Sequence, residues 1–272
     1  MHKVVVSIGC MMFSATAFAG TSDIKASNNQ IGTQAIYTYV DYTETGNGTL
    51  GTATGTLDTE RGWVPGSVLS LSTMKDWWLG NDYLAAEYDH SVGTTQYVGS
   101  YQGGGGYGSA VLTSGAMMDN YSARYGTGII GDGESMLTPY VELGHYENYR
   151  GVNYGETYSH SYYGLGALAQ YSPVRRLVFS VNALWGHTYG SAITVNGPDG
   201  FSDRLGNSQL YKAGLSADYA FMQNLHGHVG VNYMSFAYGM SPIHSLGGGV
   251  YTWEPDSETN YTTVALGFGY AF

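Results

Sequence analysis

Two adjacent residues, His160 and Ser161, are of the types that serve as base and nucleophile in hydrolases. That chemistry needs the imidazole and the hydroxyl within hydrogen-bond reach of each other. The residues around the pair alternate as in a β-strand, where successive side chains point to opposite faces. We therefore place His160 on the inner face and Ser161 on the outer face, and expect no catalytic pair.

A second candidate is the pair His226 and His228, which share a face because they are two residues apart. Imidazole nitrogens bind zinc, but a zinc site needs three or four ligands. No carboxylate stands beside them in the sequence. We interpret them as ordinary residues at the start of a strand and expect no metal site.

Glycine patterns of the GxGxxG type occur twice and invite a nucleotide-binding interpretation. The glycines are Gly103, Gly105, Gly108 and Gly126, Gly128, Gly131. Phosphate binding requires a strand before this loop and a helix after it. No helical pattern follows either match, and a chain with 41 glycines produces such matches by chance. We expect no cofactor.

The first 19 residues have the pattern of an export signal. A short basic start at His2 and Lys3 precedes a largely apolar stretch and the small-residue site Ala17-Phe18-Ala19. We expect cleavage after Ala19, which makes 1–19 a signal peptide and 20–272 the mature domain. The single cysteine, Cys10, lies within the signal, so disulfides and thiolate chemistry are excluded from the mature chain.

The last eight residues alternate strictly: positions 266, 268, 270 and 272 are large and apolar, and the others are Ala or Gly. A period of two is that of a β-strand with one face against an apolar surrounding. The octet resembles the C-terminal strand by which bacterial outer-membrane barrels are recognised during assembly, with Gly267, Tyr270 and Phe272 on the family's positions. Ala265 departs from it, because a polar residue is usual there.

This resemblance implies an all-β fold, an antiparallel transmembrane up-and-down β-barrel in the Gram-negative outer membrane. It also implies the barrel-assembly machinery, outer-membrane lipid and lipopolysaccharide as partners. Composition agrees, because charged residues make up only 11 % of the chain and the mean hydropathy is −0.16, as expected for strands that alternate apolar and polar residues. The formal net charge of −11 excludes nucleic acid as an expected partner.

Alternation and turn residues predict about ten strands, within a range of about eight to twelve, since barrel strands signal weakly one by one. We place them near 33–44, 62–74, 82–101, 118–130, 135–149, 157–171, 177–189, 208–221, 226–239 and 259–272. Short turns and longer loops alternate between them, the longer ones being 45–61, 102–117, 150–156, 190–207 and 240–258. Tyrosine and phenylalanine near the strand ends predict an aromatic girdle: Tyr171, Tyr219, Phe221, Tyr270 and Phe272.

Charged residues with inward parity predict a polar network that fills the lumen of so small a barrel. Pairing residue 131 with 135 across a short turn places Arg124 opposite Glu142, close enough for an ion pair. The expected network comprises Arg124, Glu142, Lys212, Asp218, Glu87 and Asp89. Acidic residues of the longer loops are expected to be solvated: Asp58, Glu60, Asp199, Asp203, Glu254, Asp256 and Glu258.

Omptins are surface proteases that also use ten strands and rely on acidic residues and a histidine near the outer mouth. Asp89-His90 invites comparison with them, but the surrounding omptin motifs are absent and successive residues face opposite sides. We expect no catalytic residues and a non-catalytic envelope, surface-recognition or adhesin role with an unidentified external ligand. The alternatives are a narrow, porin-like channel for small solutes and, third, an omptin-like or lipid-modifying surface enzyme.

Overall fold

The computed structural model describes residues 20–100, 105–198 and 200–272. The predicted signal peptide (1–19), Gly103 and Asp199 lie outside the described residues. Within the described ranges, no helix is both long enough and apolar enough to cross a bilayer.

Ten long strands form a closed antiparallel barrel, which confirms the predicted fold class and strand number. The ten are β1 (Gln30–Asn47), β2 (Thr54–Lys75), β3 (Asp82–Gly99), β4 (Ala110–Thr127), β6 (Ser135–Arg150), β7 (Glu156–Val174), β8 (Leu177–Val195), β10 (Gln209–Ala220), β11 (Leu225–Tyr238) and β14 (Asp256–Ala271). Short elements add α1 (Thr21–Ser27), η1 (Thr49–Gly51), β5 (Ile129–Ile130), β9 (Phe201–Arg204), β12 (His244–Gly247) and β13 (Val250–Thr252).

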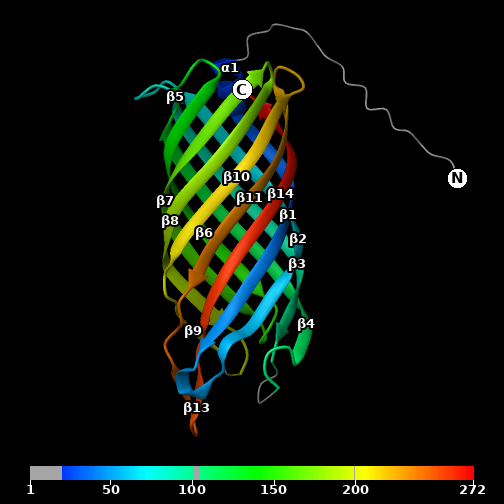
Figure 1. The fold of residues 1–272 in the computed structure, drawn as a ribbon, viewed down its shortest axis with the longest axis vertical. Coiled ribbons are helices and arrows are strands. Elements are labelled where there is room, and N and C mark those ends of the chain that lie inside the picture. The colour runs from blue at the N-terminus through cyan, green and yellow to red at the C-terminus, as the bar shows by residue number, and fades with distance from the viewer. Residues whose placement is uncertain (1–19, 101–104, 199) are drawn as a thin grey trace, which may run out of the picture.

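The barrel closes because β14 pairs with both β11 and β1, while every other long strand pairs with its neighbours in sequence. Closure leaves no sheet edge with unpaired backbone groups, which an apolar surrounding could not hydrogen-bond. Helix α1, the short turns and the last residue lie at one end, which we call the terminal end (Figure 1). The longer loops and β13 lie at the other, the loop end (Figure 1).

Several long strands, namely β1, β2, β4, β8 and β14, extend further toward the loop end than the sequence predicted. The predicted loop 45–61 shrinks to 48–53, because β1 continues to Asn47 and β2 begins at Thr54. Likewise β4 begins at Ala110, and the predicted loop 240–258 contains the hairpin of β12 and β13. The added strand ends are polar and lack the alternation of apolar residues by which a lipid-facing strand is recognised in the sequence. Their backbone hydrogen bonds nevertheless continue the sheet beyond the approximately 9–11 residues per strand that a bilayer requires.

Helix α1 is an element that the sequence did not predict, because its only strongly apolar buried residue is Ile24. A seven-residue helix is marginal by itself, so packing must hold it. Ile24 is fully buried and packs into a cluster with Met74, Tyr83, Met136 and Val178. The helix therefore covers the terminal end of the lumen (Figure 1).

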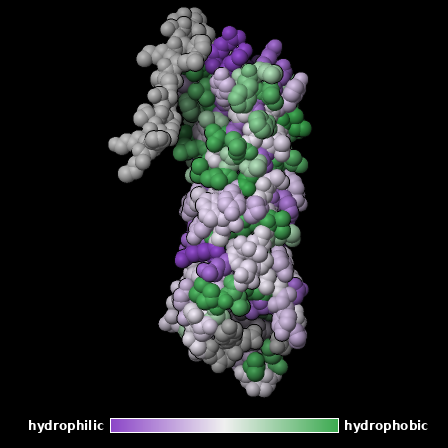
Figure 2. All heavy atoms as spheres, turned by 90° about the vertical axis from the view of Figure 1, so that its right-hand side faces the viewer, coloured by the Kyte–Doolittle hydropathy of each residue, from purple (hydrophilic) through white to green (hydrophobic). Residues whose placement is uncertain are grey.

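The outer face of the barrel is apolar toward the terminal end and polar toward the loop end. On β14 the outward residues Val264, Leu266, Phe268 and Tyr270 are all exposed, whereas Glu258 is the outward residue nearer the loops. Figure 2 shows hydrophobic side chains gathered on the half nearer the terminal end. The predicted girdle residues are each 44–57 % exposed: Tyr171, Tyr219, Phe221, Tyr270 and Phe272.

The lumen is filled by side chains rather than open along its length. A central layer of buried aromatic residues includes Tyr146 and Tyr261, whose hydroxyls lie 2.5 Å apart. These two residues come from β6 and β14, which are five strands apart in the ten-stranded ring and so face each other across the lumen. The layer therefore spans the full width of the barrel.

Candidate functional site in the lumen

Arg124, Glu142 and Lys212 form an ion-pair cluster on the lumen wall. Arg124 lies directly opposite Glu142 in the register of β4 and β6, with Nε 2.5 Å from Oε2. Lys212 on β10 reaches the other carboxylate oxygen at 2.8 Å and donates a hydrogen bond to the Tyr162 hydroxyl at 2.7 Å. The Glu142 side chain has no exposed surface, so the two cations compensate its loss of hydration.

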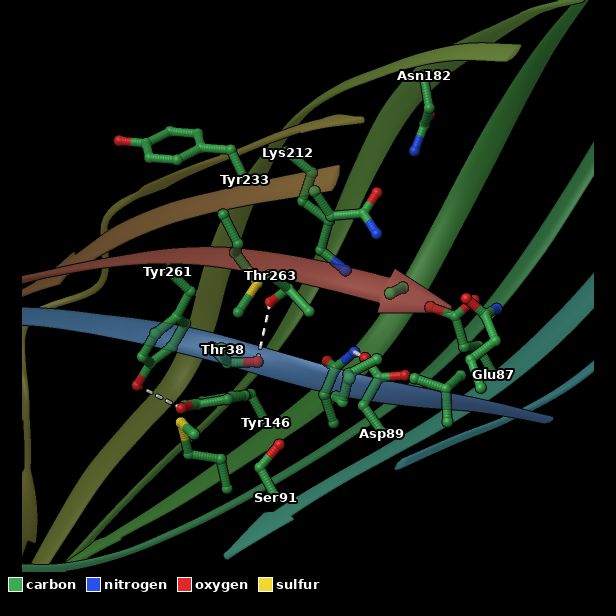
Figure 3. Close-up of a pocket in the computed structure, with 18 of the residues that line it drawn as sticks. Thr38, Glu87, Asp89, Ser91, Tyr146, Asn182, Lys212, Tyr233, Tyr261 and Thr263 are labelled. Carbon is green, nitrogen blue, oxygen red and sulfur yellow. Dashed lines mark hydrogen bonds between the residues drawn. The ribbon is translucent and has the colours of Figure 1, made fainter. Parts of the chain in front are cut away.

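Glu87 and Asp89 share the inward face of β3 and line a chamber in the lumen (Figure 3). Asn120 donates a hydrogen bond to Asp89 Oδ2 at 3.0 Å, while Asp89 Oδ1 is buried and has no partner among the described residues. Both cations of the cluster bind Glu142 instead of this pair. Glu87 and Asp89 therefore face the lumen, as predicted, but they form no ion pair with Arg124 or Lys212.

Asp218, placed by sequence in the same network, belongs to a separate group at the terminal end. Its Oδ1 lies 2.6 Å from His226 Nδ1 and its Oδ2 lies 3.0 Å from His228 Nδ1. Gln30 adds a contact of 3.3 Å to the same carboxylate. The β10–β11 register supplies this partner by setting Asp218 opposite His228, so the two histidines have a carboxylate neighbour in space although none stands beside them in the sequence.

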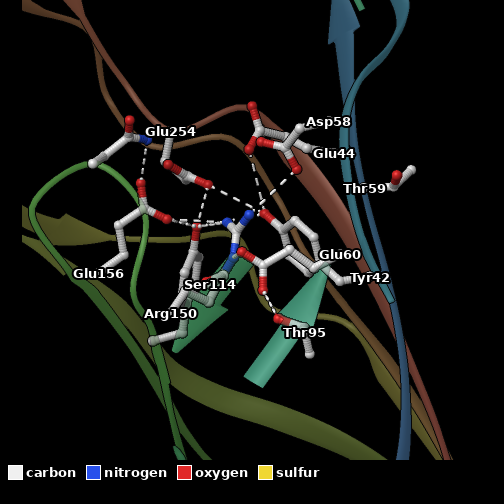
Figure 4. Close-up of polar contacts among 12 residues, drawn as sticks. Tyr42, Glu44, Asp58, Thr59, Glu60, Thr95, Ser114, Arg150, Glu156 and Glu254 are labelled. Carbon is white, nitrogen blue, oxygen red and sulfur yellow. Dashed lines mark hydrogen bonds and ion pairs between the residues drawn. The ribbon is translucent and has the colours of Figure 1, made fainter. Parts of the chain in front are cut away.

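A third polar group, missed by the sequence analysis, surrounds Arg150 at the loop end (Figure 4). The guanidinium lies 3.1 Å from Glu60, 3.0 Å from Glu156 and 3.3 Å from Asp58. It also stacks on the Tyr42 ring, 3.9 Å from the centroid. Arg150 thus joins β2, β6 and β7 inside the mouth of the barrel.

Glu254 enters this group from the loop that precedes β14. The Tyr158 hydroxyl donates a hydrogen bond to it at 2.5 Å, and the Tyr42 hydroxyl donates a longer one at 3.5 Å. Burial, followed by the charge of Glu156, raises the pKa of Glu254 to about 8. The loop is consequently tied to the mouth by a carboxyl group that favours its protonated form.

Three of the acidic residues expected in solvated loops, Asp58, Glu60 and Glu254, are buried, which corrects that expectation. Asp58 and Glu60 share the inward parity of β2, and Arg150 shares the inward parity of Glu142 on β6. Extending the alternation of inward and outward residues beyond the apolar part of each strand would have identified Asp58, Glu60 and Arg150 as inward. The apolar part of a strand ends before the strand does, because strand residues outside the bilayer need no lipid-facing side chains.

His160 and Ser161 point to opposite faces, as predicted. His160 is fully buried in the aromatic layer with Nδ1 2.7 Å from the Tyr238 hydroxyl, whereas Ser161 contacts His145 on the outside. His90 likewise faces outward, 2.9 Å from Asp119, while Asp89 faces the lumen. In both pairs, the two sequence neighbours lie on opposite faces of the barrel wall.

Within the described ranges, no group of three or more His, Cys, Asp or Glu side chains has the arrangement of a metal site. The second glycine pattern runs from the end of β4 through β5 into a turn, and strand β6 follows it rather than a helix. A phosphate-binding helix N-terminus is therefore not formed there.

No known protein family matches the sequence, and no curated protein matches it. Among solved structures, the outer membrane protease OmpT of Escherichia coli aligns with a TM-score of 0.56 at 8 % identity, over 90 % of this chain and 98 % of OmpT. The β domain of the Bordetella autotransporter BrkA aligns at 0.40 and 13 % identity, over 90 % and 100 % of the two chains. Neisserial surface protein A aligns at 0.34 and 10 % identity, over 89 % and 97 %.

The chain has the fold of an outer-membrane β-barrel. At these identities the likeness concerns the fold alone. Of the residues that resemble an assembly strand, Gly267 and Tyr270 lie on β14 and Phe272 directly follows it. Tyr270 and Phe272 are exposed on the outside, and Gly267 faces inward against β1. A Cβ at Gly267 would lie 2.3 Å from the Thr33 carbonyl oxygen, so the position requires glycine.

Proposed function

We propose that this protein is a closed barrel of the Gram-negative outer membrane that presents a recognition surface at its loop end. The observation that carries the proposal is a set of large apolar side chains exposed at the tips of the loops. Leu50, Tyr107, Tyr154 and Tyr251 belong to four different connections and are 47–80 % exposed. Exposed aromatic residues are typical anchors of binding interfaces.

The Arg150 group supports this role because it fixes the base of the surface. Arg150 joins three strands, and Tyr158 holds the loop of Glu254. A surface held in one conformation loses less conformational entropy on binding. The loop end is therefore suited to recognise a partner without reorganising.

The alternative of a narrow channel is disfavoured by the aromatic layer across the lumen. We expect no steady conductance from the refolded protein in a planar bilayer, because the buried aromatic layer that includes Tyr146 and Tyr261 crosses the lumen. Stable single-channel openings would replace this proposal with the channel.

Recognition is tested with protein-loaded lipid vesicles passed over arrays of immobilised glycans and extracellular proteins. The variant Tyr154→Ala/Tyr251→Ala should lose retention on any ligand that the wild type binds. The matched control is Trp78→Ala, which removes an exposed aromatic at the opposite end. Equal retention of all three proteins would contradict the proposal, and turnover of peptide or lipid substrates would favour the enzyme.

A further inference from the structure

The chamber beside Glu87 and Asp89 is a partly open space of about 160 Å³ within the lumen. Tyr146 and Tyr261 of the aromatic layer line one side of it, and Glu87 and Asp89 line another (Figure 3). A cavity of about 150 Å³ in another protein holds one benzene molecule. The chamber is therefore large enough for a small organic ligand.

Its wall has two chemically different parts that adjoin each other. The apolar part is formed by Ile36, Val68 and Ala265, which pack together on β1, β2 and β14. Val68 is paired directly with Asp89 across β2 and β3, so the carboxylates begin where the apolar part ends. A ligand that matches this wall has a compact apolar body with a polar group at one edge.

The charge of the chamber wall determines the sign of that polar group. The lining contains two carboxylates, Glu87 and Asp89, and two cations, Arg124 and Lys212, and both cations bind Glu142, a buried carboxylate that is not part of the lining. When Glu142 is counted, these five groups in their ionised forms sum to one negative charge, and no Lys or Arg among the described residues forms an ion pair with Glu87 or Asp89. Asp89 Oδ1 is in addition buried without a hydrogen-bond donor among the described residues. Buried acceptors of this kind are costly unless a donor satisfies them.

We propose that the chamber binds a small organic monocation, an ammonium group on a benzene-sized apolar body. The ammonium group donates hydrogen bonds to Asp89 Oδ1 and Glu87 and supplies the missing charge. The apolar body contacts Ile36, Val68 and Ala265. This site lies inside the barrel and is independent of the recognition surface at the loop end.

The test uses benzylammonium, with benzyl alcohol and benzoate as neutral and anionic probes of similar size. The protein is refolded from urea into detergent with each probe present, so that diffusion of the probe into the folded barrel does not limit binding. A ligand that binds only the folded state raises the urea midpoint as its concentration rises. We expect this rise with benzylammonium, a smaller one with benzyl alcohol and none with benzoate.

Glu87→Gln and Asp89→Asn should each weaken benzylammonium binding by about tenfold or more, the size of a hydrogen bond to a charged group. Asp119→Asn, which alters an outward carboxylate on β4, should leave binding unchanged. Ala265→Leu should exclude all probes by narrowing the apolar part, and it serves as the site test if a carboxylate variant fails to refold. Equal midpoints with and without benzylammonium, or equal preference for benzoate, would overturn the proposal and leave a water-filled chamber with a protonated carboxyl group.

Discussion

At the scale of single residues, Glu142 supplies the anion that both lumen cations contact. Its side chain has no exposed surface, and those of Arg124 and Lys212 are 19 % and 11 % exposed. Removing one partner of a buried ion pair leaves the other without compensation for its lost hydration. The cluster therefore depends on this carboxylate more than on either cation.

Glu142→Gln should lower the free energy of unfolding by about 3–5 kcal/mol, the cost of breaking a buried ion pair. The measurement is urea unfolding of the protein refolded into lipid vesicles. Glu147→Gln, an exposed change on the same strand, is the control and should stay within about 0.5 kcal/mol of the wild type. A loss no larger than that of the control would show that the pair is effectively solvated.

The raised pKa of Glu254 predicts that the stability of the protein depends on pH. Because its folded-state pKa is raised to about 8, its contribution to stability is complete at acidic pH and is lost as the pH rises through that value. Thermal unfolding should therefore move to lower temperature as the pH rises from about 4.5, the ordinary value, to about 8, and this contribution should change no further above that pH. Glu254→Gln, which mimics the protonated form, should remove this part of the pH dependence, whereas the exposed Glu258→Gln should retain it. A wild-type profile identical to that of Glu254→Gln would contradict the prediction.

At the scale of elements, the barrel depends on two segments next to its chain ends. Helix α1 fills the terminal end through Ile24, and β14 closes the sheet by pairing with β11 and β1. The Phe272 backbone N–H donates a hydrogen bond to the Asn29 carbonyl at 3.1 Å, which joins the end of β14 to the residues after α1. Both segments therefore belong to the same closed end.

Phe272→Ala should reduce the amount of folded, heat-modifiable protein in cells, if β14 is read by the assembly machinery as its resemblance implies. Phe221→Ala is the matched control, since both rings face outward and are 56 % and 52 % exposed. Refolding of the two purified variants into detergent should be similar, because they lose comparable lipid-facing surface. Equal cellular levels of the two variants would refute a specific role in assembly.

At the scale of the whole molecule, the barrel is asymmetric along its axis. Its apolar belt lies toward the terminal end, and the strands continue past it to a polar mouth. Outer-membrane barrels have short periplasmic turns and longer external loops. The terminal end is accordingly expected in the periplasm and the loop end outside the cell.

Epitope tags test this orientation. A tag inserted after Gly51, in the connection between β1 and β2, should be reached by antibody on intact cells. A tag inserted after Gly133, in the turn before β6, should be reached only after the outer membrane is permeabilised. Both glycines are exposed and have positive φ, so the two insertions are matched in local geometry. The reverse labelling pattern would invert the proposed topology.

The sequence by itself determined the fold class, the strand number and the facing of most wall residues. Strand periodicity needs only the alternation of neighbouring side chains, and a short turn fixes the register on its two sides. For this reason the alternation of two strands and the short turn between them sufficed to place Arg124 opposite Glu142. The same reasoning separated His160 from Ser161.

Only the tertiary structure decided which distant residues meet inside the barrel. The alternation of side chains predicts that a residue points inward. Its contacts inside the barrel depend in addition on its position along the barrel axis and on the position of its strand around the barrel. Asp218 therefore contacts His226 and His228 rather than the cluster of Glu142, and Arg150 forms ion pairs with acidic residues of β2 and β7. Helix α1 at the terminal end could not be predicted from the sequence either. A single buried residue, Ile24, stabilises it by packing against strands that are remote in sequence.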